Sequence, residues 1–304
     1  GEGWHVDARG LAGAPPMRVL AGEEAHVTVF RALRLLGFGR AAIEIVGADG
    51  QGRMDASALA AALADGEGPA IVCAQAGNVN TGACDPLRDV VGAAHEHVAW
   101  VHVDGAFGLW AAASPELSPL VAGAAGADSW ATDGHKWLNV PYDCGIVAVR
   151  DPEAHRAAMG MTAAYLVSAG AGERSNSDFV PEPSRRARGF AVYAALRSLG
   201  RSGVAELVER CCALARRLAS ALEHEPGIEV LNDVVLNQVL LRFGANDALT
   251  DEVIARVQDD GTCWVGGTRW QGKAAMRVSV SNWSTTEADI DRAAEAIVNA
   301  AARR

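Results

Sequence analysis

What this chain of 304 residues lacks argues against several classes of protein. No uninterrupted apolar run approaches the roughly 18 residues of a membrane-spanning helix, so no membrane span is expected. The first residues contain no apolar stretch of the kind that a secretory signal carries. Aromatic residues make up only 6% of the chain, and no aromatic-rich basic surface is evident. The formal net charge of −10 further disfavours nucleic acid and anionic membranes as partners.

The cysteines also lack a recognisable pattern. Six are present, none of them in a CxxC pair, and Cys211 and Cys212 are neighbours in a helical segment. Neither a zinc site nor a disulfide framework is therefore expected, and no bound metal is predicted. Reduced thiols in a cytoplasmic protein are the simplest explanation.

The first half of the chain alternates β-branched runs with alanine-rich helical stretches. Six strands are predicted, most of them apolar on both faces and separated by helices, which indicates an α/β fold with a mostly parallel sheet covered by helices on both sides. The predicted strands are 18–21, 42–46, 70–75, 100–104, 129–132 and 146–150.

A different pattern follows in the second half. Two helices, 184–199 and 204–223, are separated by Gly200, and shorter elements follow them. These elements are strands at 234–243, 262–265 and 276–280, a helix at 250–259 and a last helix after a capping box at 284–287. We expect a large domain over 1–175 and, over 176–304, a linking helix with a small α+β domain. The stretch 161–183 has little periodicity, which fits a lid and a plain surface loop equally well.

Two residues point to the chemistry of pyridoxal 5'-phosphate (PLP). Lys136 follows a predicted strand and could form a Schiff base with the aldehyde, which requires a partly neutral amine. Asp104 ends another strand, and a carboxylate there could keep the pyridine nitrogen protonated. Both would lie beyond the carboxyl ends of parallel strands, where ligands collect in such sheets. Taken alone, each has an ordinary explanation, because aspartates form turns and loop lysines are usually solvated.

Ordered motifs along most of the chain resemble the group II PLP-dependent amino-acid decarboxylases, the family of aromatic-amino-acid and glutamate decarboxylases. The stretches that carry the resemblance are 24–29, 77–87, 100–106, 128–138 and 141–145. The resemblance implies a type I PLP-dependent transferase-like fold, PLP as cofactor, a small amino-acid substrate and a homodimer with sites at the subunit interface.

The same resemblance implies roles for individual residues. Lys136 corresponds to the Schiff-base lysine, and Asp104 to the partner of the pyridine nitrogen. Ala106 corresponds to the residue whose methyl group packs against the ring. His26 corresponds to the histidine on the other ring face, where a flat imidazole could also hydrogen-bond a substrate carboxylate.

Three further residues are implied to lie near the cofactor. His135 corresponds to a residue close to the phosphate. Asn78 and Thr81 fall in a loop that approaches the cofactor in relatives, although the usual threonine-rich run of that loop is altered here.

We therefore expect decarboxylation of an L-amino acid through a Schiff base and a quinonoid intermediate. Aminotransfer, aldehyde synthesis and C–S cleavage stay open, because all of them use the same lysine and aspartate. Another alternative that stays open is a truncated, non-catalytic relative that only pairs with another chain. The substrate itself is not identified by the sequence.

Two departures from the family pattern bear on these alternatives. Relatives cradle the phosphate with a Gly/Ser/Thr-rich loop at a helix N-terminus, but Gly10 and Gly13 are not followed by such a helix start. The chain is therefore expected to be a fragment of a longer polypeptide or a shortened relative. The mobile loop of the family often carries a proton-donating tyrosine, whereas here Tyr165 stands only at the beginning of that loop. Replacement of this donor in relatives is associated with oxidative deamination or aldehyde formation.

Overall fold

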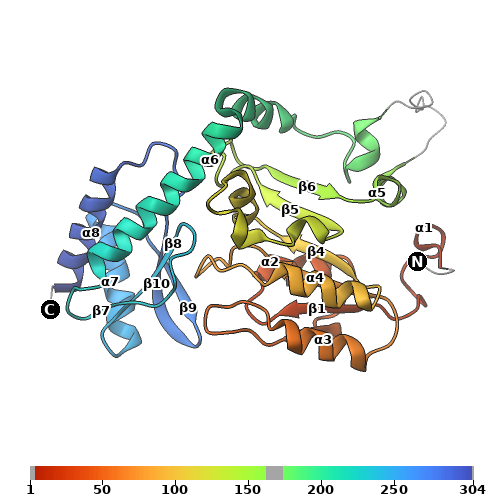
Figure 1. Cartoon of the computed structure of the whole chain (residues 1–304), viewed down its shortest axis with the longest axis horizontal. Helices are drawn as coiled ribbons and strands as arrows, with labels where there is room; N and C mark the ends of the chain where they lie inside the picture. The colour runs from red at the N-terminus through yellow and green to blue at the C-terminus, as the bar shows by residue number, and fades with distance from the viewer. Residues whose placement is uncertain (1–3, 162–173, 303–304) are drawn as a thin grey trace.

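Six strands form the larger of two sheets in the computed structural model, which describes residues 4–161 and 174–302 (Figure 1). The order across the sheet is β2-β1-β3-β4-β5-β6. The first five strands are parallel, and β6 runs antiparallel to β5. Their bounds are β1 Arg18–Gly22, β2 Ile43–Val46, β3 Ala70–Gln75, β4 Trp100–Asp104, β5 Ser129–Asp133 and β6 Gly145–Val149. The predicted α/β class is confirmed, with one antiparallel edge strand that the apolar pattern did not reveal.

Helices cover both faces of this sheet. On one face lie α3 (Ala56–Asp65) and α4 (Leu87–Glu96), which bury apolar side chains against the central strands. Asp55 starts α3 by accepting hydrogen bonds from two backbone N–H groups of its first turn, as its sequence position predicts. On the other face, α2 (Val27–Leu35) packs Leu33 in one cluster with residues of β1, β2 and β3. This second helix begins at the edge of the sheet where the parallel strands end.

A second sheet lies beyond a long helix. Helix α6 (Gly189–Leu222) runs from the large sheet to the small one and is kinked at Gly200, whose φ of +65° is not helical (Figure 1). The small sheet is antiparallel in the order β7-β8-β10-β9. The strands of this sheet are β7 Ile228–Val230, β8 Gln238–Phe243, β9 Gly266–Trp270 and β10 Lys273–Ser279. Two helices of the same part of the chain are α7 Asp247–Asp260 and α8 Glu287–Ala302.

Several predicted boundaries in this second half were wrong. No strand forms at 262–265, because the chain pairs with β10 only from Gly266 onward. Strand β8 starts four residues later than predicted, and the short β7 was not predicted. Helix α6 starts at Gly189 rather than at residue 184, and α5 (Pro152–Met159) was missed. The domain boundary at 175/176 stays a prediction.

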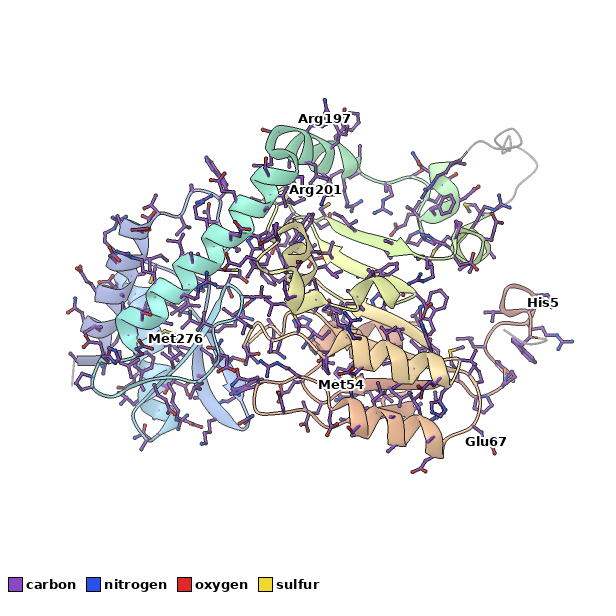
Figure 2. All side chains as sticks on the ribbon, in the orientation of Figure 1. His5, Met54, Glu67, Arg197, Arg201 and Met276 are labelled. Atoms are coloured by element: carbon purple, nitrogen blue, oxygen red, sulfur yellow. The ribbon has the colours of Figure 1, made fainter. Side chains whose placement is uncertain are left out.

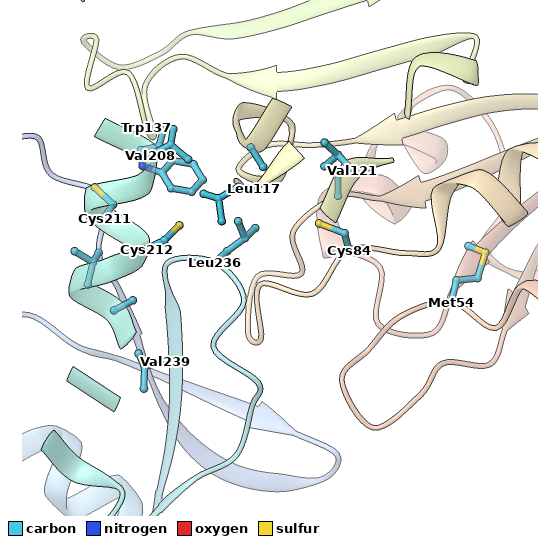
Figure 3. Close-up of a cluster of buried hydrophobic side chains, with 14 of the residues drawn as sticks. Met54, Cys84, Leu117, Val121, Trp137, Val208, Cys211, Cys212, Leu236 and Val239 are labelled. Atoms are coloured by element: carbon cyan, nitrogen blue, oxygen red, sulfur yellow. The ribbon is translucent and has the colours of Figure 1, made fainter. Parts of the chain in front are cut away.

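One buried core joins the two sheets. Trp137 is fully buried and lies beside Val208 and Cys211 of α6, while Leu236 reaches the same cluster from the loop before β8 (Figure 3). Figure 2 shows how side chains fill both halves, with Met54 in the large part and Met276 in the small one. Trp137 directly follows Lys136, so this core fixes the backbone on which that lysine stands.

Part of the predicted loop at 161–183, namely 162–173 with Tyr165, lies outside the described residues. Within 4–161 and 174–302, no helix is both long and apolar enough to cross a membrane.

Asp85 ties the end of β3 to the loop before α3. Its two carboxylate oxygens accept hydrogen bonds from the backbone N–H groups of Met54, at 2.8 Å, and Gln75, at 2.7 Å. Burial raises the pKa of this carboxyl from 3.8 to about 6, even though the two hydrogen bonds oppose the rise. The folded protein therefore binds the Asp85 proton more tightly than the unfolded chain does.

This linkage predicts the pH dependence of an Asp85→Asn variant. Stability that Asp85 contributes is fully present below pH 3.8 and is lost as the pH rises through about 6. The amide cannot ionise, so the free energy of unfolding of wild type minus that of the variant should fall by about 3 kcal/mol between pH 3 and pH 7. Urea unfolding across this range measures the difference. The exposed Asp89→Asn variant controls for the lost charge, and a difference that stays constant with pH would contradict the account.

Candidate active site

A cavity of about 610 Å³ lies between α2 and the strands β3, β4 and β5, and its wall includes residues at the carboxyl ends of these strands. Four of the seven predicted site residues line it: His26, Asp104, Ala106 and Lys136. They come from three separate elements that only the parallel topology brings together. The remaining three, His135, Asn78 and Thr81, are not part of its wall.

Asp104 and Ala106 stand on a tight turn at the end of β4. The Ala106 N–H donates to Asp104 Oδ1 at 3.3 Å, which orients the carboxylate at the sheet edge. A Cβ on Gly105 would lie 2.1 Å from Leu109, so the turn has no room for a larger residue there. Gly105, which has no side chain, is therefore all that stands between the Asp104 carboxylate and the Ala106 methyl group along the turn.

Lys136 follows β5 and meets two partners in the cavity. Its Nζ lies 3.1 Å from Asp133 Oδ2 and 4.7 Å from the centre of the Phe107 ring. The lysine is thus held in the wall of the cavity by a carboxylate and an aromatic face.

His135 is engaged mainly outside the cavity. Its Nδ1 lies 3.0 Å from the backbone nitrogen and 2.9 Å from the backbone oxygen of Cys144, and its ring stacks on Tyr142 at 4.2 Å. The Nε2 atom lies 3.7 Å from Asp133 Oδ2. His135 therefore borders the site through Asp133, and its proximity to a phosphate stays a prediction.

His26 stands at the N-cap of α2, where its ring faces the cavity. Its Nδ1 lies 2.7 Å from Thr28 Oγ1 and accepts a longer hydrogen bond from the Thr28 N–H at 3.4 Å. Burial lowers the pKa of His26, and the charges of Lys136 and Arg277 lower it further, whereas Asp104 and Asp133 oppose the shift. The imidazole is therefore neutral at neutral pH.

Asn78 and Thr81 shape a buried loop. The Asn78 carboxamide accepts from the N–H groups of Asn80 and Thr81 and donates to the Glu24 carbonyl. Thr81 donates its hydroxyl hydrogen to the Gln51 carbonyl, and its own carbonyl accepts from Asn232. These side chains hold Gly77 and Val79, which do line the cavity, in place. Direct contact of Asn78 or Thr81 with a cofactor stays a prediction.

Several groups at this site were not predicted from the sequence. Asp133 and Phe107 contact the lysine; Asp133 lies inside the motif 128–138, and Phe107 directly follows the motif 100–106. His102 lies two residues before Asp104 on the same strand, and its Nδ1 is 2.9 Å from Ser129 Oγ. Arg277 extends from β10 of the small sheet, where it donates to the Val79 carbonyl at 3.3 Å, and burial lowers its pKa. In the sequence, Arg277 could have been noticed as a single arginine in the mostly apolar strand β10.

The wall of the cavity suits the ring of a pyridoxal cofactor. Asp104 could face the ring nitrogen, Lys136 the aldehyde, and Ala106 and His26 the two ring faces. The phosphate end is less complete within the described residues. Gly10 ends the short helix α1 (Val6–Arg9), and the chain then leads into β1 without starting another helix.

The fold and the wall of the cavity together suit the binding of a pyridoxal cofactor. The profile of the family described as "Pyridoxal-dependent decarboxylase conserved domain" matches residues 13–243, and the chain belongs to this family. The predicted family and its pyridoxal cofactor are thereby confirmed.

Individual relatives agree with this assignment. The chain is 28% identical over 281 residues to an aromatic-L-amino-acid decarboxylase of Bacillus atrophaeus, covering 87% of this chain and 58% of that protein. It is 29% identical over 292 residues to an L-2,4-diaminobutyrate decarboxylase of Rhizobium meliloti (strain 1021), covering 92% and 59%. The chain thus spans less than two thirds of the length of these relatives.

A solved structure extends the likeness to three dimensions. The crystal structure of Oryza sativa TDC with PLP and tryptamine matches with a TM-score of 0.89 and 28% identity. The match covers 97% of this chain and 64% of that one. The predicted type I PLP-dependent transferase-like fold is confirmed.

Proposed function

We propose that the protein carrying this chain decarboxylates an L-amino acid with the help of PLP. The observation that supports this most is that Asp104, Lys136 and His26 converge on one cavity in a member of this decarboxylase family. When bound, the pyridoxal group supplies an electron sink for the electron pair left as the Cα–carboxylate bond breaks.

Lys136 would act as nucleophile and as carrier of a proton. Its Nζ must leave Asp133 and lose a proton before it can attack an aldehyde, and Asp133 is the nearest acceptor, at 3.1 Å. Once an incoming amino acid has taken its place, Nζ could take a proton back from Asp133 and deliver it to Cα after CO2 has left.

Asp104 would keep the ring nitrogen protonated. A carboxylate fixed at the end of β4 and bonded to the Ala106 N–H holds that position without moving. His26 would cover the opposite ring face and hydrogen-bond the substrate carboxylate, for which a neutral imidazole is suited.

The reaction is better supported than the substrate. Both curated relatives described above are named as decarboxylases, which favours decarboxylation over aminotransfer, aldehyde synthesis or C–S cleavage. One of them acts by name on aromatic amino acids and the other on diaminobutyrate, at nearly equal identity to this chain. The side chain of the substrate is therefore left open.

Release of CO2 tests the proposal. The natural polypeptide that contains this chain, supplied with PLP, is expected to release CO2 and the matching amine from at least one natural L-amino acid. Carbon-14 in the carboxyl group measures the release, and a parallel assay follows keto acids and aldehydes. Formation of a keto acid without CO2 would replace the proposal with aminotransfer.

A homodimer and a cytoplasmic location are part of the proposal. Support for a subunit interface comes from large apolar side chains exposed on the first half of α6, with Phe190 at 79% and Tyr193 at 65% exposure.

Support for a reducing compartment comes from six unpaired cysteines, five of them buried.

A further inference from the structure

We infer that Thr28 is a positioning residue that fixes His26 in the Nε2–H tautomer, so that the imidazole presents a hydrogen-bond donor to a carboxylate in the cavity. The inference rests on the proposed function only in its choice of acceptor, the carboxylate of an amino acid. The state of the imidazole itself depends on contacts within this chain.

The hydrogen bonds around Nδ1 set the tautomer. The Thr28 backbone N–H points at His26 Nδ1 from 3.4 Å, and an N–H can only donate. Nδ1 must therefore accept, which leaves the ring proton on Nε2. The Thr28 hydroxyl, 2.7 Å from the same atom, then donates as well. Because 3.4 Å is long for a hydrogen bond, this shorter contact is the one that holds Nδ1 against the N–H.

The helix end reinforces this arrangement. His26 is the N-cap of α2, where unpaired N–H groups concentrate partial positive charge. A proton on Nδ1 would point at the Thr28 N–H, and an imidazolium would in addition place a positive charge at the positive end of the helix. The charged groups that face the ring have opposite effects on the pKa of His26. Asp104 and Asp133 favour the imidazolium, whereas Lys136 and Arg277 disfavour it. Burial decides in favour of the neutral ring.

The tautomer decides what His26 can bind. With the proton on Nε2, the edge away from Thr28 donates a hydrogen bond and suits an acceptor such as a carboxylate. With the proton on Nδ1, the same edge would present a lone pair, which repels a carboxylate. Thr28 would thus influence substrate affinity from outside the reacting atoms.

A pair of variants tests the tautomer directly. Thr28→Val removes the hydroxyl at nearly constant volume, and Thr28→Ser retains it. Nitrogen-15 NMR of the histidine rings in the full polypeptide, before PLP is added, reports which nitrogen carries the proton, with His26→Gln identifying the signal. We expect Nε2–H in wild type and Thr28→Ser. In Thr28→Val only the long N–H contact of 3.4 Å remains to hold the ring, so the ring can turn away from it and a gain of Nδ1–H is expected.

A control and a kinetic readout complete the test. Val27→Ala alters an exposed neighbour in the same helical turn, with 69% of Val27 exposed, and should leave the tautomer unchanged. In the PLP-loaded protein, Thr28→Val should raise the KM for the amino acid about tenfold with a smaller change in kcat, and Thr28→Ser should restore it.

The outcomes separate this inference from the proposed function. An unchanged tautomer in Thr28→Val overturns the inference even if the enzyme decarboxylates amino acids. A shifted tautomer with an unchanged KM overturns the carboxylate as the acceptor. Absence of CO2 release overturns the proposed function and leaves the NMR result standing.

Discussion

Replacing Lys136 with alanine is expected to abolish covalent cofactor binding and to lower kcat by at least about three orders of magnitude. The physical reason is that, among the residues that the structure describes, no second amine lies in the cavity wall. In the proposed function Nζ is both the nucleophile for the aldehyde and the donor that returns the proton, so both functions would disappear together. The visible absorbance of lysine-bound PLP and the rate of CO2 release measure the two losses separately.

The composition of the chain provides a matched control. It contains only two lysines, Lys136 and Lys273, and Lys273 is exposed at the start of β10. Lys273→Ala should therefore keep both the absorbance and the activity. A Lys136→Ala protein that retains the visible absorbance would contradict the assignment.

Asp104→Asn is expected to lower kcat by about 10² to 10³-fold while leaving the cofactor attached to Lys136. The amide matches the carboxylate in shape and can still accept from the Ala106 N–H, so the turn at the end of β4 should persist. What it loses is the charge that keeps the ring nitrogen protonated. Steady-state kinetics and the visible spectrum of the same sample distinguish loss of activation from loss of cofactor.

The Asp89→Asn variant controls again for the change of one negative charge, because Asp89 is exposed in the first turn of α4. It should leave kcat unchanged. A normal kcat in Asp104→Asn would show that this carboxylate does not activate the ring.

Much of the large sheet could be predicted because its strands are buried on both faces and read as short apolar runs. The small sheet was less predictable. Residues 262–265 include Cys263, Trp264 and Val265 and look like a strand, but the actual β9 is the glycine-containing stretch Gly266–Trp270. Its position is set by antiparallel pairing with β10, which no local pattern reveals.

The candidate site also has features that could be predicted from the sequence and features that could not. Asp104 and Lys136 were predictable because the carboxyl ends of parallel strands share one edge of the sheet. The hydrogen bonds of Asn78 and Thr81 were not, because their partners are the backbone carbonyls of Glu24 and Gln51 and the side-chain amide of Asn232, far away in the sequence. Thr28 could not be predicted for another reason. Its proposed role depends on which ring nitrogen of His26 it faces, and only the structure shows this.

The central claim is a covalent link between Lys136 and pyridoxal. Borohydride reduction of the PLP-loaded protein makes such a link permanent, and peptide mass spectrometry then locates it. The label is expected on the peptide that contains Lys136 and not on the one that contains Lys273. A label on Lys273, or on neither lysine, would contradict the account.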